Sequence, residues 1–322
     1  MEASGRDLLG RVVEQAGGQA VLDALAERLS GADLTSLLLE VMRRRADRVT
    51  PAEVLRRYAG DRFVRPSDLD LRELRRVEDA MFGALPAEFD VLTLAPVVPL
   101  AAHSSVATVD PRKVIATVRR TEVAADPTNA LALEAAVRRR RLLSTAPVER
   151  PEIVVRLATS QRVTRAALFD GPVSFAHFQL LGVVTAGRDI GGNWFERRAL
   201  LEHLRIGAVG LRAAGADSIT LALTSLDEVG ERWLPDVREE FSDWPGVTVV
   251  DAPEREAGRG YYQRLCFKIF VRFGEAEPIE ISDGGFVDWT AQLLGSRKER
   301  LLISGHGLDR VAIMTRERPA GS

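Results

Sequence analysis

The chain has 322 residues, of which 46% are hydrophobic, so it is long enough for one large domain or two ordinary ones. Its formal net charge of -2 argues against general nucleic-acid binding, which needs a basic surface. A single cysteine, Cys266, excludes an internal disulfide and a cysteine-based metal cluster. The N-terminus lacks the apolar core of a signal peptide, and no segment is an uninterrupted apolar membrane span, so we expect a soluble cytoplasmic protein.

Residues 6–59 show apolar side chains at helical spacing, interrupted at Gly17 and Gly18. Thr50 precedes a proline and, three residues on, a glutamate, which is a capping-box pattern at a helix start. We therefore expect a helical N-terminal extension over residues 1–65, followed by one domain over residues 66–322.

That domain begins with an amphipathic helix over residues 69–85, whose apolar stripe predicts a dimer interface. The following segment, FDVLTLAPVVPL, reads as a strand interrupted by Pro96 and Pro99. Because proline cannot donate to a sheet ladder, this strand should lie at a sheet edge or an interface. A further strand is expected in KVIATVRRTEV, and Asp126 begins the next helix.

The rest of the chain alternates hairpins and helices. EIVVRLATSQRVTRA and HFQLLGVVTAGR predict one hairpin, and YYQRLCFKIFVRFG with PIEISDGG predicts a second. FERRALLEHLRIGAVGLRAAG is an amphipathic helix, SITLALTSL is a strand, and LLISG is the last strand. Since strands and crossover helices do not alternate regularly, the pattern favours an α+β fold, an antiparallel sheet with helices on one face, over a doubly wound sheet.

The last strand meets the sequence GHGLDR at residues 305–310. A glycine-tight turn into a helix would let an anion approach the backbone, and Arg310 at the helix start would pair with a phosphate. The alternative is a structural turn in which Arg310 pairs with a surface acid.

Several segments, in one fixed order, resemble the catalytic domain of class II aminoacyl-tRNA synthetases, and in particular its histidyl branch. The helix 69–85 with FDVLTLAPVV is similar to the first signature motif, VTRA through HFQLLGVVTAG to the second, and GHGLDR to the third. Asp126 with Thr128, the double tyrosine at 261–262 and the DGGFVDW turn also match histidyl enzymes. The resemblance covers roughly residues 68–312 and implies a class II antiparallel sheet flanked by helices.

The resemblance implies ATP and Mg²⁺ as cofactors. It places Arg165, or alternatively Arg162, on the α-phosphate and Phe178 against adenine. The third motif adds Gly305, Gly307, Asp309 and Arg310 to the nucleotide site. A core position in a hairpin is the other interpretation of Phe178.

The resemblance also implies an acid-binding end of the site. Asp126 and Thr128 would hold a substrate amino group, although plain helix capping by Asp126 is the competing interpretation. Tyr262 belongs to the double-tyrosine strand. Arg259 is the nearest candidate for a catalytic arginine that precedes the tyrosines, but it stands two residues too late.

The sequence departs from the family pattern mainly in the amino-acid pocket and the ATP loop. Ala167 replaces a glutamate, Ala176 an arginine, Lys268 a glutamate and Phe286 an arginine, and Gln263-Arg264 replaces a glycine. Histidine is therefore a doubtful substrate. No anticodon-binding domain is expected after residue 312.

These features leave two main hypotheses open. One is a stand-alone synthetase-like protein that binds ATP and a small amino or carboxylic acid, and forms an acyl-adenylate for an acceptor other than tRNA. The other is a catalytically inactive regulatory or partner-binding paralogue, similar to the regulatory subunit of ATP phosphoribosyltransferase. Whether the protein is an enzyme stays open. We expect a homodimer, with a protein partner as an alternative and with neither tRNA nor a membrane as a partner.

Overall fold

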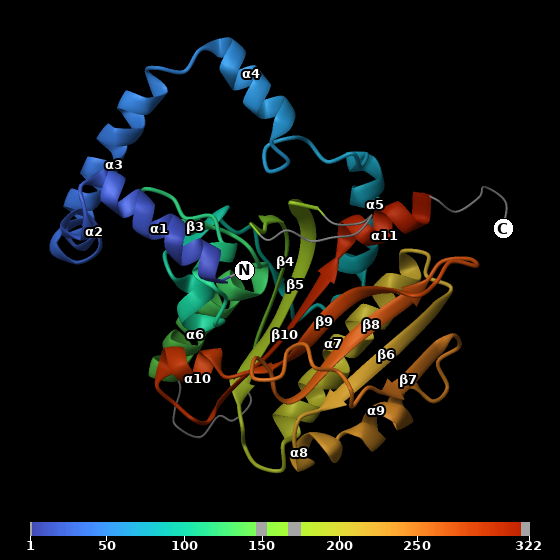
Figure 1. Ribbon diagram of the computed structural model, residues 1–322. Coiled ribbons are helices and arrows are strands. Elements are labelled where there is room, and N and C mark those ends of the chain that lie inside the picture. Colours follow the sequence, from blue (N-terminus) through green and yellow to red (C-terminus); the bar gives the residue numbers. More distant parts are fainter. Residues whose placement is uncertain (1, 146–152, 167–174, 317–322) are drawn as a thin grey trace. The chain divides into compact units, whose positions relative to one another are not determined.

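The computed structural model describes residues 2–145, 153–166 and 175–316 (Figure 1). The chain forms two compact units: residues 1–65 with 116–121, and residues 66–115 with 122–322. Among the described helices, none combines the length and the apolar character that crossing a membrane requires.

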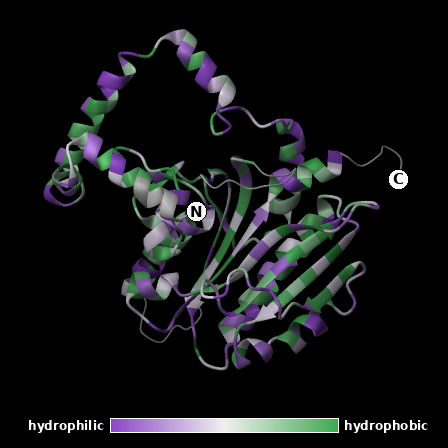
Figure 2. Ribbon diagram, viewed as in Figure 1, coloured by the Kyte–Doolittle hydropathy of each residue, from purple (hydrophilic) through white to green (hydrophobic). Residues whose placement is uncertain are grey.

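The first unit is helical. Its elements are α1 (Glu2–Ala16), α2 (Gln19–Asp23), η1 (Ala24–Arg28), α3 (Gly31–Ala46) and α4 (Pro51–Gly60). Thr50 caps α4 by accepting a hydrogen bond from the backbone N–H of Glu53, as its capping-box pattern predicts. Hydrophilic and hydrophobic residues alternate along α3 and α4 (Figure 2), and none of the described side chains in α2, η1, α3 or α4 is fully buried.

The second unit is built on a sheet of eight strands. In spatial order they are β1 (Asp90–Val91), β4 (Val155–Thr164), β5 (His177–Arg188), β10 (Glu299–Gly307), β9 (Ile279–Val287), β8 (Gln263–Arg272), β6 (Ser218–Ser225) and β7 (Val247–Asp251). The central pairs are antiparallel, and β1 and β7 add a parallel pair at each edge. Both predicted hairpins, β4–β5 and β8–β9, are confirmed.

The segment FDVLTLAPVVPL does not form the single strand that was predicted, although its first part, β1, lies at the edge of the eight-stranded sheet. β1 ends at Val91, and β2 (Val97–Pro99) pairs instead with β3 (Thr121–Val123) in a separate two-stranded sheet. The strand expected over KVIATVRRTEV is likewise reduced to β3. A loop replaces its first part: Thr117 donates its N–H to the carbonyl of Thr121 at 2.8 Å, and Arg120 has a left-handed φ of 57°.

Helices cover both faces of the sheet, so the expectation of helices on one face was wrong. One face packs against α5 (Leu71–Gly83), α7 (Trp194–Ala213), α9 (Leu234–Phe241) and α11 (Leu308–Arg316). The other packs against α6 (Pro127–Thr145) and α10 (Trp289–Leu294). Figure 1 shows α7 passing behind the sheet. The burial of β5 reflects this arrangement. Its residues from Leu180 to Gly187 are all buried, a pattern typical of a strand covered on both sides.

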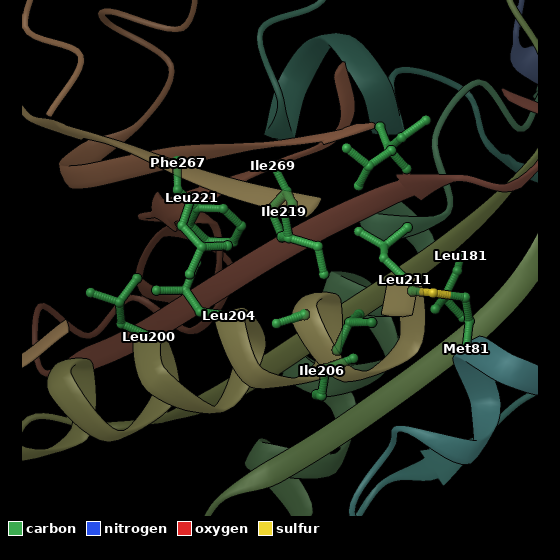
Figure 3. Packing of buried hydrophobic residues seen from close by; sticks show 14 of the residues in the cluster. Met81, Leu181, Leu200, Leu204, Ile206, Leu211, Ile219, Leu221, Phe267 and Ile269 are labelled. Atoms are coloured by element: carbon green, nitrogen blue, oxygen red, sulfur yellow. The ribbon is translucent and has the colours of Figure 1, made fainter. Parts of the chain in front are cut away.

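The larger core lies between α7 and the sheet, where Leu200, Leu204 and Leu211 of α7 pack against strand residues (Figure 3). Met81 of α5 closes the end of this cluster and is fully buried. Gly210 permits the approach, because a Cβ there would meet the sulfur of Met81 at 2.6 Å. Leu74, Val77 and Met81 of the apolar stripe are therefore covered by their own chain, whereas Leu71 is exposed. The homodimer stays a prediction, with little of that stripe left as its basis.

A chain of buried hydrogen bonds crosses this core. Thr185 contacts His203 Nε2 at 3.0 Å, and His203 Nδ1 contacts Ser304 at 2.9 Å. Ser304 contacts His306 Nε2 at 3.4 Å, and His306 Nδ1 contacts Ser282 at 2.7 Å. Burial lowers the pKa of His203 to about 3 and that of His306 to about 4, so both rings are neutral at physiological pH.

Candidate functional site

A cavity of about 610 Å³ lies over the sheet where β5, β9 and β10 meet the start of α6. Of the residues that the sequence singled out, it is lined by Asp126, Thr128, Arg165, Phe178, Tyr262, Gly305, Gly307, Asp309 and Arg310. These residues come from distant parts of the chain, so the fold alone brings them together. Arg162 and Arg259 do not line this cavity.

Four residues of the sequence GHGLDR line the cavity, but the segment is not a tight turn. β10 runs to Gly307 and α11 begins at Leu308, so the strand leads directly into the helix. Neither Gly305 nor Gly307 has a left-handed φ, and the predicted glycine-tight turn is wrong. A Cβ at Gly305 would make only ordinary contact with Leu180, at 3.5 Å. The two glycines therefore leave space over the strand. The backbone conformation at these two positions does not require glycine.

Arg310 stands in the first turn of α11 and lines the cavity. Its Nη1 donates to the backbone carbonyl of Glu280 at 2.9 Å. No carboxylate in the described ranges lies within ion-pair distance of it. The predicted alternative, a structural pair with a surface acid, is not seen within those ranges. A helix N-terminus and an arginine without a carboxylate together favour an anion at this point.

Arg162 is engaged elsewhere. Its Nε donates to Nδ1 of His177 at 2.8 Å, and its Nη2 donates to Asp309 at 3.2 Å. Asp309 is 1% exposed and also accepts the N–H of Gln179 at 2.8 Å. Burial raises the pKa of Asp309, and these bonds oppose that rise. Arg162 is therefore held by the largely buried Asp309 at the cavity wall, which leaves Arg165 as the arginine of this pair that itself lines the cavity.

Arg165 is held at the cavity by three contacts. Its Nε donates to the carbonyl of Ala125 at 3.0 Å, and its Nη2 pairs with Asp126 at 3.2 Å. Its guanidinium lies over the ring of Phe178, 5.1 Å from the centroid. Phe178 also packs against a small buried cluster, so it is both a cavity wall and a hairpin packing residue.

Asp126 caps α6 and also lines the cavity, so both interpretations of this residue hold. Its Oδ1 accepts the backbone N–H of Thr128 at 2.9 Å and the Thr128 hydroxyl at 2.7 Å. Its Oδ2 faces Arg165. The side chain of Asp126 is 28% exposed, which leaves this carboxylate accessible from the cavity.

Three residues that the sequence did not bring together form a cluster beside the cavity. Arg255 Nη2 donates to both oxygens of Asp283 at 2.9 Å, and the Tyr262 hydroxyl donates to Oδ1 of Asp283 at 2.9 Å. The Arg255 guanidinium lies 5.6 Å from the centre of the Tyr262 ring. Burial raises the pKa of Asp283, and Arg255 and the tyrosine hydroxyl oppose that rise. Burial also raises the pKa of Tyr262.

Arg259 lines a separate cavity and donates to the backbone carbonyls of Arg255 and Pro253. The arginine next to the tyrosine cluster is instead Arg255. The family resemblance places its catalytic arginine at position 257. Arg255 and Arg259 each lie two residues from that position in EREAGRGYY, so the resemblance pointed equally to both.

The altered positions have structural roles of their own. Phe286 is 3% exposed and packs edge-on against Trp233, with ring centroids 5.4 Å apart. Lys268 pairs with Glu280 at 2.7 Å. Ala176 is buried beside β5, whereas Ala167 lies outside the described residues.

The segment DGGFVDW, expected as a glycine-rich turn, instead continues β9 as far as Val287. Gly284 fits there because a Cβ would meet the carbonyl oxygen of Ile303 on β10 at 2.8 Å. The glycine thus permits close approach between neighbouring strands.

Comparison with protein-family models and with curated proteins finds no match. Solved structures do match. The apo histidyl-tRNA synthetase of S. aureus is 11% identical with a TM-score of 0.58, covering 78% of this chain and 72% of that one. A Bacillus halodurans ATP phosphoribosyltransferase regulatory subunit/histidyl-tRNA synthetase is 12% identical with a TM-score of 0.54, covering 78% and 82%.

A histidine–tRNA ligase subunit from Alicyclobacillus acidocaldarius is 13% identical with a TM-score of 0.55, covering 78% of this chain and 97% of that one. At such identities the likeness concerns the fold and not the activity. The chain has the α+β fold of the class II aminoacyl-tRNA synthetases, in the form seen in histidyl-tRNA synthetase and its regulatory-subunit relatives.

Proposed function

We propose that the cavity binds ATP together with a small amino or carboxylic acid and joins them as an acyl-adenylate, which is passed to an acceptor other than tRNA. The observation that carries this proposal is Arg310, a cavity arginine without a carboxylate partner in the described part of the chain. The other charged groups of the cavity are already matched: Asp126 with Arg165, Asp309 with Arg162, Asp283 with Arg255 and Glu280 with Lys268. The cavity thus has one cation in excess, which a phosphate would neutralise.

Arg165 and Phe178 support a nucleotide as the source of that phosphate. The cation lies over an aromatic ring at the same cavity wall. A nucleotide combines a flat base, which stacks on aromatic rings, with anionic phosphates, which pair with guanidinium groups. A free phosphate would not need the ring.

The acid would bind at the start of α6. The Asp126 carboxylate would accept hydrogen bonds from the ammonium group of the acid, and the Thr128 hydroxyl, which donates to Oδ1, would hold that carboxylate in place. The acid's carboxylate oxygen would then attack the α-phosphorus, forming a carbon–oxygen–phosphorus link while the bond to pyrophosphate breaks. Arg165 and Arg310 would neutralise the negative charge that spreads over the phosphate oxygens during this step.

Mg²⁺ would accompany the nucleotide. The described residues contain no group of three histidine, cysteine, aspartate or glutamate side chains placed to hold a metal ion. This suits Mg²⁺, which is commonly bound by substrate phosphates, water and one or two carboxylates. Glu280 is a cavity carboxylate that could serve in this way.

A second function, regulation or partner binding without catalysis, is favoured by the altered positions. Phe286 is a core residue where the family has an arginine, and Lys268 forms an ion pair where the family has a glutamate. The first change removes a cation, and the second reverses the sign of a charge. A protein that kept the nucleotide end and lost the chemistry would have this pattern.

Exchange of radioactive pyrophosphate into ATP separates the two functions. Adenylation predicts exchange with at least one acid from a panel of amino acids and simple carboxylic acids, and predicts that Arg165→Ala abolishes it. A variant remote from the cavity, Arg205→Ala on the exposed face of α7, should retain full exchange. If the protein binds ATP but no acid of the panel supports exchange, the adenylation proposal is wrong and the regulatory function is the better explanation.

A further inference from the structure

His103 and Glu122 form a buried pair behind the acid-binding end of the cavity. His103, in η2 (Ala102–Val106), is fully buried, and Glu122, in β3, is 4% exposed. The Glu122 carboxylate contacts His103 Nδ1 at 2.6 Å and accepts the backbone N–H groups of His103 at 2.8 Å and Ala101 at 3.2 Å. The left-handed φ of 71° at Ala101, unusual for a residue with a side chain, is stabilised by the last of these bonds.

The other ring nitrogen of His103 accepts the backbone N–H of Ala125 at 3.0 Å. A backbone N–H can only donate, so Nε2 must be without a proton and Nδ1 must carry it. The ring is therefore a neutral bridge of fixed tautomer. It connects an acid to the amide that precedes Asp126.

The dipeptide Ala125–Asp126 is where this bridge meets the cavity. The Ala125 carbonyl accepts Nε of Arg165, and the Asp126 carboxylate accepts Nη2 of the same arginine. The preceding residue, Ala124, is fixed as well, since its N–H donates to the Pro96 carbonyl and its carbonyl accepts the Thr164 N–H. The hydrogen bond of the Ala125 amide thus links the buried pair to both charged groups.

We infer that His103 and Glu122 are positioning residues that fix Ala125 and thereby hold Asp126 and Arg165 in the geometry for ligand binding. The identity of the ligand in this inference rests on the proposed function. The fixing of Ala125 by His103 and Glu122 does not depend on that function. Neither residue touches the cavity. Both act through the backbone.

Two substitutions separate the two hydrogen bonds of the ring. His103→Gln places an amide oxygen near the Nε2 position and can still accept the Ala125 N–H. His103→Asn is shorter: it can still donate to Glu122 but cannot reach Ala125. Because the Asn variant loses the bond to Ala125, its Kd for ATP with Mg²⁺ should rise roughly tenfold, the size expected for one buried hydrogen bond. Calorimetric titration measures this Kd. The Gln variant should lose clearly less.

Amide hydrogen exchange and nitrogen NMR supply measurements that do not depend on ligand. Exchange at the Ala125 and Thr128 amides should rise in His103→Asn and stay slow in His103→Gln. Nitrogen spectra of the histidines in the wild type should show His103 protonated at Nδ1. If His103→Asn does not fold, Glu122→Gln, which keeps the size of the side chain but weakens the anchor of the ring, should show a smaller but measurable rise in exchange at Ala125, because Nε2 can still accept that N–H.

The outcomes are distinct. If the wild type binds ATP and both His103 variants bind it with the Kd of the wild type, the positioning inference is wrong and the proposed function stands. If the wild type binds no nucleotide, the proposed function fails. The inference is then decided by exchange alone: equal rates at Ala125 in wild type and variants, or a proton on Nε2, would overturn it.

Discussion

Replacement of Arg310 by alanine tests the anion site directly. The substitution removes a guanidinium whose described hydrogen bond goes to the Glu280 carbonyl. A charge-assisted hydrogen bond to a phosphate contributes about 1.5–3 kcal/mol, so the Kd for ATP with Mg²⁺ should rise roughly 10- to 150-fold. The free energy of unfolding should fall by only about 1 kcal/mol, the usual contribution of one hydrogen bond.

Calorimetric titration measures the Kd, and thermal unfolding without ligand measures the stability. Arg259→Ala is the matched control, because Arg259 also donates to backbone carbonyls but lies outside this cavity. If wild type and Arg310→Ala bind ATP equally, Arg310 is only a structural residue of the strand–helix junction. If neither binds, the nucleotide proposal is wrong and partner binding becomes the better explanation.

Three further predictions concern the scaffold. His203 and His306 have folded pKa values of about 3 and about 4, below the unfolded value near 6.5, so their stabilising contribution is complete above pH 6.5. As the pH falls below that value, the free energy of unfolding should drop by up to about 2.7 kcal/mol per pH unit for the two groups; urea titrations at pH 7.5, 6 and 5 that gave equal stabilities would contradict this. Gly284→Ala should cost about 1–3 kcal/mol in thermal unfolding because its Cβ meets Phe267 at 2.5 Å, whereas Gly305→Ala, with its nearest contact at 3.5 Å, should be tolerated. The protein should be a homodimer at micromolar concentration, and a strictly monomeric mass from light scattering would refute that.

Local patterns in the sequence were enough to predict most strands of the sheet. The strands of the hairpins β4–β5 and β8–β9 are long and apolar, so the pattern of the sequence located them. Where tertiary contacts decide, the sequence was less informative. The short strand β1 is defined by its pairing with β4, and the loop over residues 116–121 contains the left-handed backbone of Arg120; local propensity encodes neither.

The candidate site divides in the same way. Arg310 and Asp126 were identified from the family resemblance together with their expected places at helix starts, where both residues do stand. Arg255 was missed because its importance comes from Asp283, a residue 28 positions further along the chain. The sequence also could not distinguish the roles of Arg162 and Arg165. The distinction depends on the buried Asp309 that holds Arg162, and on Ala125 and Asp126, which hold Arg165.

The pair between Asp126 and Arg165 predicts how two ligands would bind. The two side chains are 28% and 35% exposed, and such a pair is worth about 1 kcal/mol or less, which a phosphate contact exceeds. A nucleotide alone would take Arg165 and leave Asp126 without its cation, whereas an acid with an ammonium group would supply a new one. ATP should therefore bind more tightly in the presence of an amino acid that supports pyrophosphate exchange, and Asp126→Asn should remove that difference. Equal Kd values for ATP with and without the amino acid would show that the two ends of the cavity are not coupled through this pair.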